Sequence, residues 1–266
     1  MTLQLRNPHS VLAALRSRPA DVLEIQLGAG GGDAWAQVRA EAEQLGIAVA
    51  KAGGPSPDVA SGPRGKRGDR RGRPPREGAS RDSIAHATVK ERSATAVEEL
   101  VAEVAATDIF LALDQLQDPQ NVGSIFRTAS FFGVRGIVMT QSRAAPLTGV
   151  TYDVASGGLE TVPFAQETNL RRALQTMRDA GVWILGSSEH AETSIHDVPR
   201  DRAWVLVVGN EETGLRRLTL EDCDVVCRIP GPSPFEAGVG SGLESVTSLN
   251  VAVATGILLS SLRRET

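Results

Sequence analysis

The 266-residue sequence is poor in cysteine, poor in aromatic residues and without a long apolar run. Its two cysteines are too few for a disulfide framework, and the four histidines stand far from them in the chain, so we expect no structural zinc site. No stretch approaches the roughly 18 to 20 consecutive apolar residues that cross a bilayer. The N-terminal residues also lack a charged segment followed by an apolar block. These absences predict a cytoplasmic protein that binds no metal and enters no membrane.

The charge of the chain is unevenly distributed. The net charge is −4, yet residues 61–81 hold eight basic and two acidic residues, which makes this segment +6 and the rest of the chain −10. The segment 53–81 is rich in Gly, Pro and Arg and nearly free of apolar residues, so we interpret it as a linker without a packed core. It is either a solubilising spacer or an electrostatic arm for RNA. The arm interpretation assigns RNA contacts to Arg64, Lys66, Arg67, Arg70, Arg71 and Arg73.

Two α/β regions flank this linker. Before it, the pattern predicts helices at 10–16 and 33–45 and strands at 22–27 and 47–50. These elements form a small domain over residues 1–52, which the segment 82–92 can extend. After it, apolar strands alternate with helices. The expected strands are 109–113, 136–140, 182–186, 203–208 and 225–229, and the expected helices are 121–132, 170–180 and 249–262. Continuously apolar strands separated by helices predict a parallel sheet covered on both faces, in a domain over residues 95–266.

The segment that follows the strand at 109–113 contains the first candidate site residues. Asp118 and Pro119 favour a turn, and Asn121 is placed to cap the next helix. Arg127 lies off the apolar face of that helix. Taken alone, these two polar residues are better explained as an ordinary cap and a solvated side chain than as functional residues.

Two later segments add polar residues where strands end. The strand at 203–208 ends at Gly209, and Glu211 follows at the carboxyl edge of the sheet, where ligands bind in open α/β folds. Further along, Ile229 ends another strand, and a loop rich in Gly, Ser and Pro leads to Ser248 and Asn250, either of which can cap the final helix.

In order, the segments DPQNVGSIFRTA, VVGNEETGL and IPG…SLNVAVATG resemble the three motifs of the SpoU/TrmH-type RNA 2′-O-ribose methyltransferases of the SPOUT superfamily. The N-terminal region resembles the ribosomal-protein-like substrate-binding domain of the large-subunit rRNA guanosine methyltransferase subgroup. The resemblance implies an α/β fold in which this small domain precedes a trefoil-knotted methyltransferase domain with a parallel sheet. It also implies a homodimer and transfer of a methyl group from S-adenosylmethionine to a ribose 2′-hydroxyl. Structured RNA is the implied partner, with guanosine of 23S rRNA favoured over tRNA.

The resemblance also carries residue roles onto this sequence. Backbone contacts to S-adenosylmethionine map onto Gly209, Ile229 and Leu249. Arg127 matches the catalytic arginine, and the remaining polar motif positions are Asn121, Glu211, Ser248 and Asn250. Two roles are open for Arg127: it acts as a base, or it binds an RNA phosphate and stabilises charge on the 2′-oxygen. The second role suits a guanidinium, because that group stays protonated at neutral pH. Two rivals remain: an RNA-binding protein that has lost methyl transfer, and a related enzyme that methylates a base.

Overall fold

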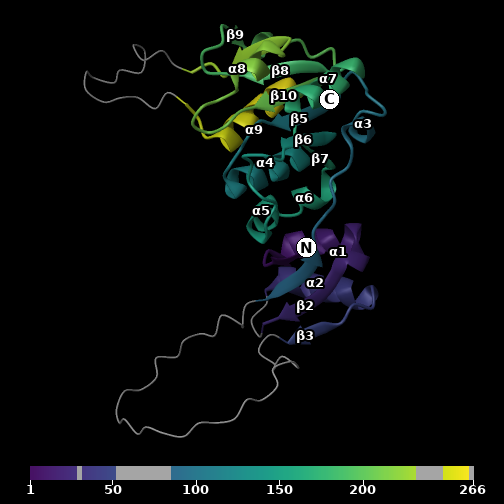
Figure 1. Cartoon of the computed structure of the whole chain (residues 1–266). Coiled ribbons are helices and arrows are strands. Elements are labelled where there is room, and N and C mark those ends of the chain that lie inside the picture. The colour runs from purple at the N-terminus through teal and green to yellow at the C-terminus, as the bar shows by residue number, and fades with distance from the viewer. Residues whose placement is uncertain (29–31, 52–84, 232–247, 264–266) are drawn as a thin grey trace, which may run out of the picture. The chain divides into compact units, whose positions relative to one another are not determined.

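The computed structural model describes residues 1–28, 32–51, 85–231 and 248–263 (Figure 1). The chain divides into two compact units, Met1–Lys90 and Glu91–Thr266. The basic linker 53–81 and the loop that precedes Ser248 lie outside the described residues, so the RNA contacts predicted for the linker stay predictions. No helix within the described ranges is long and apolar enough to span a bilayer.

The first unit is a mixed sheet with two α-helices. The spatial strand order is β1 (Thr2–Leu5), β4 (His86–Lys90), β2 (Val22–Leu27) and β3 (Val49–Lys51). The other elements are α1 (Pro8–Ser17), the short 3-10 helix η1 (Pro19–Asp21) and α2 (Asp33–Gln44). Because β4 pairs antiparallel with both β1 and β2, this sheet is built from segments on both sides of the basic linker. Of these strands, β1 was missing from the sequence prediction.

The second unit contains a larger sheet whose strands all run parallel. In spatial order the strands are β7 (Phe164–Glu167), β6 (Gly136–Thr140), β5 (Ile109–Leu113), β10 (Trp204–Val208), β8 (Trp183–Ser187), β11 (Val225–Arg228) and β9 (Thr193–Ser194). The expected parallel α/β fold is confirmed. The two strands that the sequence did not predict, β7 and β9, lie at the edges of the sheet, where a short strand with few neighbours leaves a weak pattern.

The helices of this unit pack against the sheet and alternate with its strands along the chain. They are α3 (Val97–Leu100), α4 (Pro119–Phe131), α5 (Gly149–Ala155), α6 (Gly158–Thr161), α7 (Leu170–Asp179), α8 (Arg217–Glu221) and α9 (Val251–Leu262), with the short 3-10 helix η3 (Ile195–Asp197). The helices that the sequence did not predict, α5, α6, α8 and α3, are all short. Four to seven residues do not complete the repeat on which a helical pattern is recognised.

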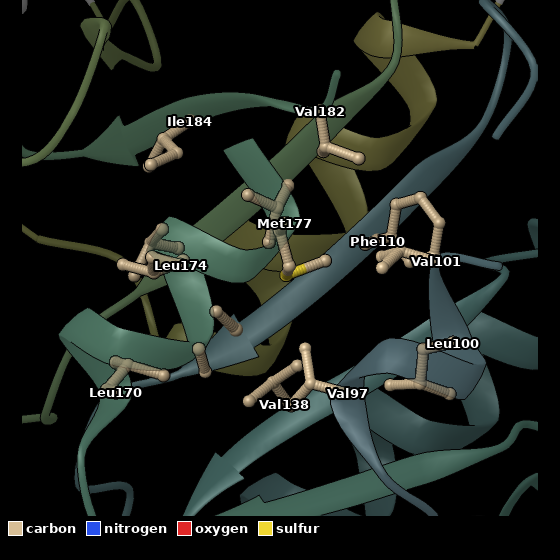
Figure 2. Close-up of a cluster of buried hydrophobic side chains, with 14 of the residues drawn as sticks. Val97, Leu100, Val101, Phe110, Val138, Leu170, Leu174, Met177, Val182 and Ile184 are labelled. Atoms are coloured by element: carbon tan, nitrogen blue, oxygen red, sulfur yellow. The ribbon is translucent and has the colours of Figure 1, made fainter. Parts of the chain in front are cut away.

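The core on one face of this sheet lies beneath α3 and α7. Figure 2 shows Leu174 and Met177 of α7 packed with Val97 of α3 and with strand residues such as Phe110 and Ile184. All of these side chains are buried. Both faces of β5 and β10 are buried in this way, which explains why their sequences are continuously apolar rather than alternating.

On α4, two glycine contacts bring backbones unusually close together. A Cβ atom added to Gly123 of α4 would lie 2.6 Å from the carbonyl oxygen of Thr151 in α5. One added to Gly158 of α6 would lie 2.5 Å from the carbonyl oxygen of Phe126 in α4. Real Cβ atoms do not approach backbone so closely, so only glycine fits at either position. The segment that contains α5 and α6 therefore fixes α4 directly through its backbone.

The two cysteines lie beside the sheet and are free. Cys227 is in β11, and Cys223 lies just before that strand, next to Gly186 of β8. Burial raises the pKa of each thiol to about 12. Both thiols are therefore protonated and unreactive at neutral pH.

Candidate functional site

Loops that carry two of the predicted motifs leave the sheet side by side. β5 and β10 are parallel neighbours, and Val208 at the end of β10 is in register with Leu113 at the end of β5. The segment before α4 and the loop 209–215 therefore emerge at the same carboxyl edge. From the sequence we expected polar motif residues at this edge, where ligands bind in open α/β folds.

The first turn of α4 differs from the prediction. Asp118, not Asn121, is the N-cap, and its carboxylate accepts a hydrogen bond of 2.9 Å from the backbone N–H of Gln120. Aspartate is among the strongest capping residues, and Pro119 suits the first helical position because its missing N–H needs no partner there. The predicted cap at Asn121 was therefore wrong. Because Asn121 does not cap the helix, its amide side chain is available for other contacts.

Asn121 links the other two motifs. Its Nδ2 donates to Oε1 of Glu211 at 3.1 Å, and its Oδ1 accepts from Nδ2 of Asn250 at 3.0 Å. Glu211 also accepts from the backbone N–H groups of Gln117 and Asp118, both at 3.4 Å. Three residues from three separate motifs thus form one hydrogen-bonded chain, which we call the polar triad: Asn121, Glu211 and Asn250.

Asn250 has a second role as the N-cap of α9. Its Oδ1 accepts from the backbone N–H of Ala252 at 2.9 Å and of Val253 at 3.3 Å, which confirms one of the two caps proposed from the sequence. The cap fixes the carbonyl side of the amide, so its N–H groups point away to Asn121. Ser248 and Leu249 precede this cap and are exposed.

The loop 209–215 is folded tightly on itself. Asn210 and Gly214 exchange backbone hydrogen bonds of 3.1 and 2.9 Å. A Cβ atom at Gly209 would lie 2.2 Å from the carbonyl carbon of Gly214, so no larger residue fits there. The side chain of Asn210 closes the turn, since its Oδ1 accepts from the backbone N–H groups of Glu212 and Thr213 at 3.0 and 3.2 Å. Its Nδ2 donates 3.0 Å to the carbonyl oxygen of Gln115, which ties the loop to the segment before α4.

Ile229 also reaches this edge. It directly follows β11, which is parallel to β8, and β8 is the neighbour of β10. The ends of β10 and β11 therefore lie on the same edge with one strand between them. The structure thus brings Gly209 and Ile229 to the edge that carries the polar triad.

Arg127 stands apart from the triad. It lies on α4 six residues beyond Asn121, which is about 9 Å along the helix axis. Its side chain is exposed and, among the residues that the structure describes, makes no hydrogen bond or ion pair. Asn121, Glu211 and Asn250 therefore form an interlocked group, whereas Arg127 has no partner among the described residues and Ser248 is exposed ahead of the α9 cap.

A groove of about 860 Å³ lies between α4 and α9, next to the triad. Its lining includes Asn121, Ser124 and Thr128 of α4 and Val253 and Ile257 of α9. Val253 is 52% exposed and Ile257 38% exposed, so the described residues leave an apolar part of α9 uncovered. Leu258 and Leu259 of the same helix are buried, so α9 packs on one side and leaves these two residues exposed on another.

Asp114 is a residue of this site that the sequence analysis missed. It directly follows β5, and its side chain is fully buried while it binds Arg216 beyond the loop 209–215. A carboxylate immediately after a continuously apolar strand is the signal that could have identified it, because a charge at the end of a buried strand needs a partner.

Comparison with known proteins places these residues in a family. Residues 108–260 match the model of the SpoU rRNA Methylase family. The 23S rRNA (guanosine-2′-O-)-methyltransferase RlmB of Nitrosomonas europaea is 39% identical over 175 residues, which are 66% of this chain and 63% of that protein. The chain therefore spans less than two thirds of the length of this curated relative.

Solved structures resemble nearly the whole chain. The SpoU methyltransferase AviRb from Streptomyces viridochromogenes has a TM-score of 0.71 at 19% identity, and the match covers 98% of this chain and 88% of that one. An AdoMet-bound rRNA methyltransferase from Sinorhizobium meliloti has a TM-score of 0.69 at 20% identity, covering 98% and 86%. At such identities the likeness establishes the fold.

Proposed function

The chain belongs to the SpoU rRNA Methylase family, and we propose that it transfers a methyl group from S-adenosylmethionine to a ribose 2′-hydroxyl of structured RNA. The observation that carries this proposal is the polar triad, because three motifs far apart in the sequence meet at one edge of the sheet. The RlmB name of the Nitrosomonas relative supports guanosine of 23S rRNA as the substrate.

The residues at this edge fit S-adenosylmethionine. The adenine ring of the cofactor is flat and allows close approach to backbone groups, and the 209–215 loop offers open backbone at Gly214, where an added Cβ would meet no atom within 4 Å. We assign the backbone of Gly209, Ile229 and Leu249 to the cofactor. The AdoMet-bound Sinorhizobium structure of the same fold supports S-adenosylmethionine as the cofactor. The cofactor supplies an activated methyl group, and the protein has to align a ribose oxygen with it.

Within this proposal, the polar triad and Arg127 have different tasks. Glu211 and Asn250 orient Asn121 and the loop backbone, and Ser248 adds a hydroxyl beside them. Arg127 binds an RNA phosphate through its two-pronged guanidinium and stabilises the negative charge that develops on the 2′-oxygen. Its exposure and lack of a partner among the described residues support this role, because a cation paired inside the chain could not also bind phosphate.

We further propose that the protein acts in the cytoplasm as a homodimer in which α4 and α9 meet their copies. The exposed Val253 and Ile257 beside the groove support this arrangement, since water-exposed apolar side chains on neighbouring turns favour association. We expect a dimeric mass by light scattering at micromolar concentration and a shift toward monomer in Val253→Asp. A wild-type monomer with full activity would contradict the dimer.

Two structural elements of the family complete the proposal. The trefoil knot is supported by the path of the chain, because α9 follows β11 yet packs on α4, across the intervening β8 and β10. The unit Met1–Lys90 is assigned to RNA binding, as the resemblance of its sequence implies.

The test of the function is direct. Purified protein with S-adenosylmethionine should methylate 23S rRNA, and mass spectrometry should locate the methyl group on a guanosine ribose. The same ribose should be unmethylated in RNA from a deletion strain and restored by the wild-type gene. Methylation of tRNA alone would identify tRNA rather than rRNA as the substrate, and methylation of a base would contradict the proposed chemistry. Binding of RNA without any methyl transfer would leave the RNA-binding alternative.

A further inference from the structure

Asp114 has the most completely buried carboxylate near the candidate site. Its side chain is 0% exposed, and its oxygens have only two side-chain partners among the described residues. Arg216 donates a hydrogen bond from Nε to Oδ2 at 3.0 Å, and its Nη2 forms an ion-pair contact of 2.8 Å with Oδ1, which accepts no hydrogen bond from the described residues. The hydroxyl of Thr219, which is itself buried, donates to Oδ2 at 2.8 Å.

The contacts of Asp114 reach both ends of the 209–215 loop. Its backbone N–H donates to the carbonyl oxygen of Val208 at 2.9 Å, and Val208 is the residue immediately before the loop. Its carboxylate binds Arg216, the residue immediately after the loop. Asp114 at the end of β5 therefore binds the start of the loop through its backbone and the end of the loop through its side chain.

This arrangement resists displacement for an energetic reason. A buried carboxylate that loses its partners bears an uncompensated desolvation cost, so a movement of Arg216 away from Asp114 is strongly unfavourable. One guanidinium contacts both carboxylate oxygens, Oδ2 by a hydrogen bond and Oδ1 by an ion pair. Because Arg216 is the N-cap of α8, the start of that helix is held with it. The loop between these two fixed ends carries Glu211 of the polar triad.

We propose that Asp114 is a positioning residue that sets the conformation of the 209–215 loop and, through it, the placement of Glu211 and of the cofactor-facing backbone. The statement that the loop faces the cofactor rests on the proposed function. The statement that Asp114 holds the loop does not, since the contacts above lie entirely within the chain.

The experiment compares Asp114→Asn with the wild-type protein in two independent measurements. The first is hydrogen exchange of peptides that contain residues 209–216, which should become faster by about tenfold as the loop opens locally. The second is the Kd for S-adenosylmethionine, which should rise by about tenfold or more, since small misplacement of binding groups has large effects. Both are measured at least ten degrees below the melting temperature of each variant.

Asp222→Asn is the matched control. Asp222 also pairs with an arginine through two contacts, Nε and Nη2 of Arg171 at 2.6 and 2.9 Å, and lies at the far end of α8, away from the loop. The control makes the same chemical change and should lower stability while leaving loop exchange and cofactor affinity as in the wild type. Arg216→Lys is the second variant, because lysine keeps the charge but has a single nitrogen and cannot contact the two carboxylate oxygens from two nitrogens as arginine does. It should loosen the loop in the same direction by a smaller factor, and it carries the test if Asp114→Asn does not fold.

The outcomes separate this inference from the proposed function. Faster loop exchange and weaker cofactor binding in Asp114→Asn and Arg216→Lys, but not in Asp222→Asn, would support the positioning role. A lower melting temperature with unchanged loop exchange and unchanged Kd would overturn it, because Asp114 would then act on stability alone. If the wild-type protein binds no S-adenosylmethionine while the loop still loosens in the variants, the proposed function fails and the positioning role stands.

Discussion

At its first turn α4 is tied by side chains to two other segments of the chain, whereas Arg127, about 9 Å further along the helix, has no side-chain partner among the described residues. The backbone beneath Arg127 is nevertheless tightly held, because Gly158 packs against Phe126 and Arg127. The first turn of the helix is thus held by side-chain hydrogen bonds to two other motifs, whereas at Arg127 only the backbone is held. This difference separates groups that are arranged before substrate binds from a group whose partner comes from outside the chain.

The largest effect is expected from Arg127→Ala. If Arg127 acts on the RNA, methyl transfer should fall by at least about 100-fold, as for removal of other groups that stabilise a transition-state charge. The Kd for S-adenosylmethionine should stay at the wild-type value, because the proposed cofactor contacts lie in other loops. Single-turnover methylation and calorimetric binding measure the two effects. Arg172→Ala, which removes an exposed arginine from α7, is the control and should change neither.

Near-wild-type turnover in Arg127→Ala would break the distinction between the two ends of α4. A loss of cofactor affinity equal to the loss of turnover would also contradict it, because Arg127 would then belong with the interlocked group.

The next largest effect is expected from Glu211→Gln. The carboxylate accepts from Asn121 and from two backbone N–H groups, and a glutamine would turn N–H donors toward some of them. Loss of hydrogen bonds to a charged acceptor should reduce turnover by about tenfold. Glu212→Gln is the matched control, since this neighbour is exposed and its side chain has no partner among the described residues. Equal activity of the two variants would remove Glu211 from the site.

The sequence located these groups better than it located what holds them. The resemblance of the three motifs to those of the family was enough to assign Asn121, Glu211 and Asn250 to one site. The cap at Asp118 could have been predicted too, because Asp followed by Pro is a strong start signal for a helix. The partnership of Asp114 with Arg216 and the contact of Gly158 with α4 could not, because each joins residues whose proximity arises only when α4, α6 and α8 are packed on the sheet.

A smaller effect is expected from Gly158→Ala. The added methyl group would meet the carbonyl oxygen of Phe126 at 2.5 Å, so α6 or α4 must shift. Overpacking of this kind should lower the free energy of unfolding by about 1 to 3 kcal/mol, and the shift should reduce turnover without changing cofactor affinity. Chemical denaturation and the kcat and Kd values test both parts.

Gly256→Ala in α9 is the control for that substitution, because its nearest contact, the methyl group of Thr128, lies at an ordinary 3.6 Å. It should leave stability unchanged or raise it by up to about 1 kcal/mol, since alanine favours a helix over glycine. Equal stability of both glycine variants would show that α6 does not fix the backbone beneath Arg127.

The smallest effect is expected from the basic linker, for which the arm interpretation predicts an action through charge. Residues 61–81 carry +6 on a chain that is otherwise −10, so the rest of the chain repels RNA overall. If the linker engages several phosphates, log affinity should fall with log salt at a slope of about −0.7 per phosphate neutralised, as for single strands. Deleting residues 62–76 should therefore weaken RNA binding and flatten the salt dependence, with the Kd for S-adenosylmethionine unchanged. An uncharged Gly/Ser linker of equal length separates charge from length. Unchanged RNA affinity and an unchanged salt slope in that variant would leave only the spacer interpretation, and Arg127 would then be the cation on which RNA binding chiefly depends.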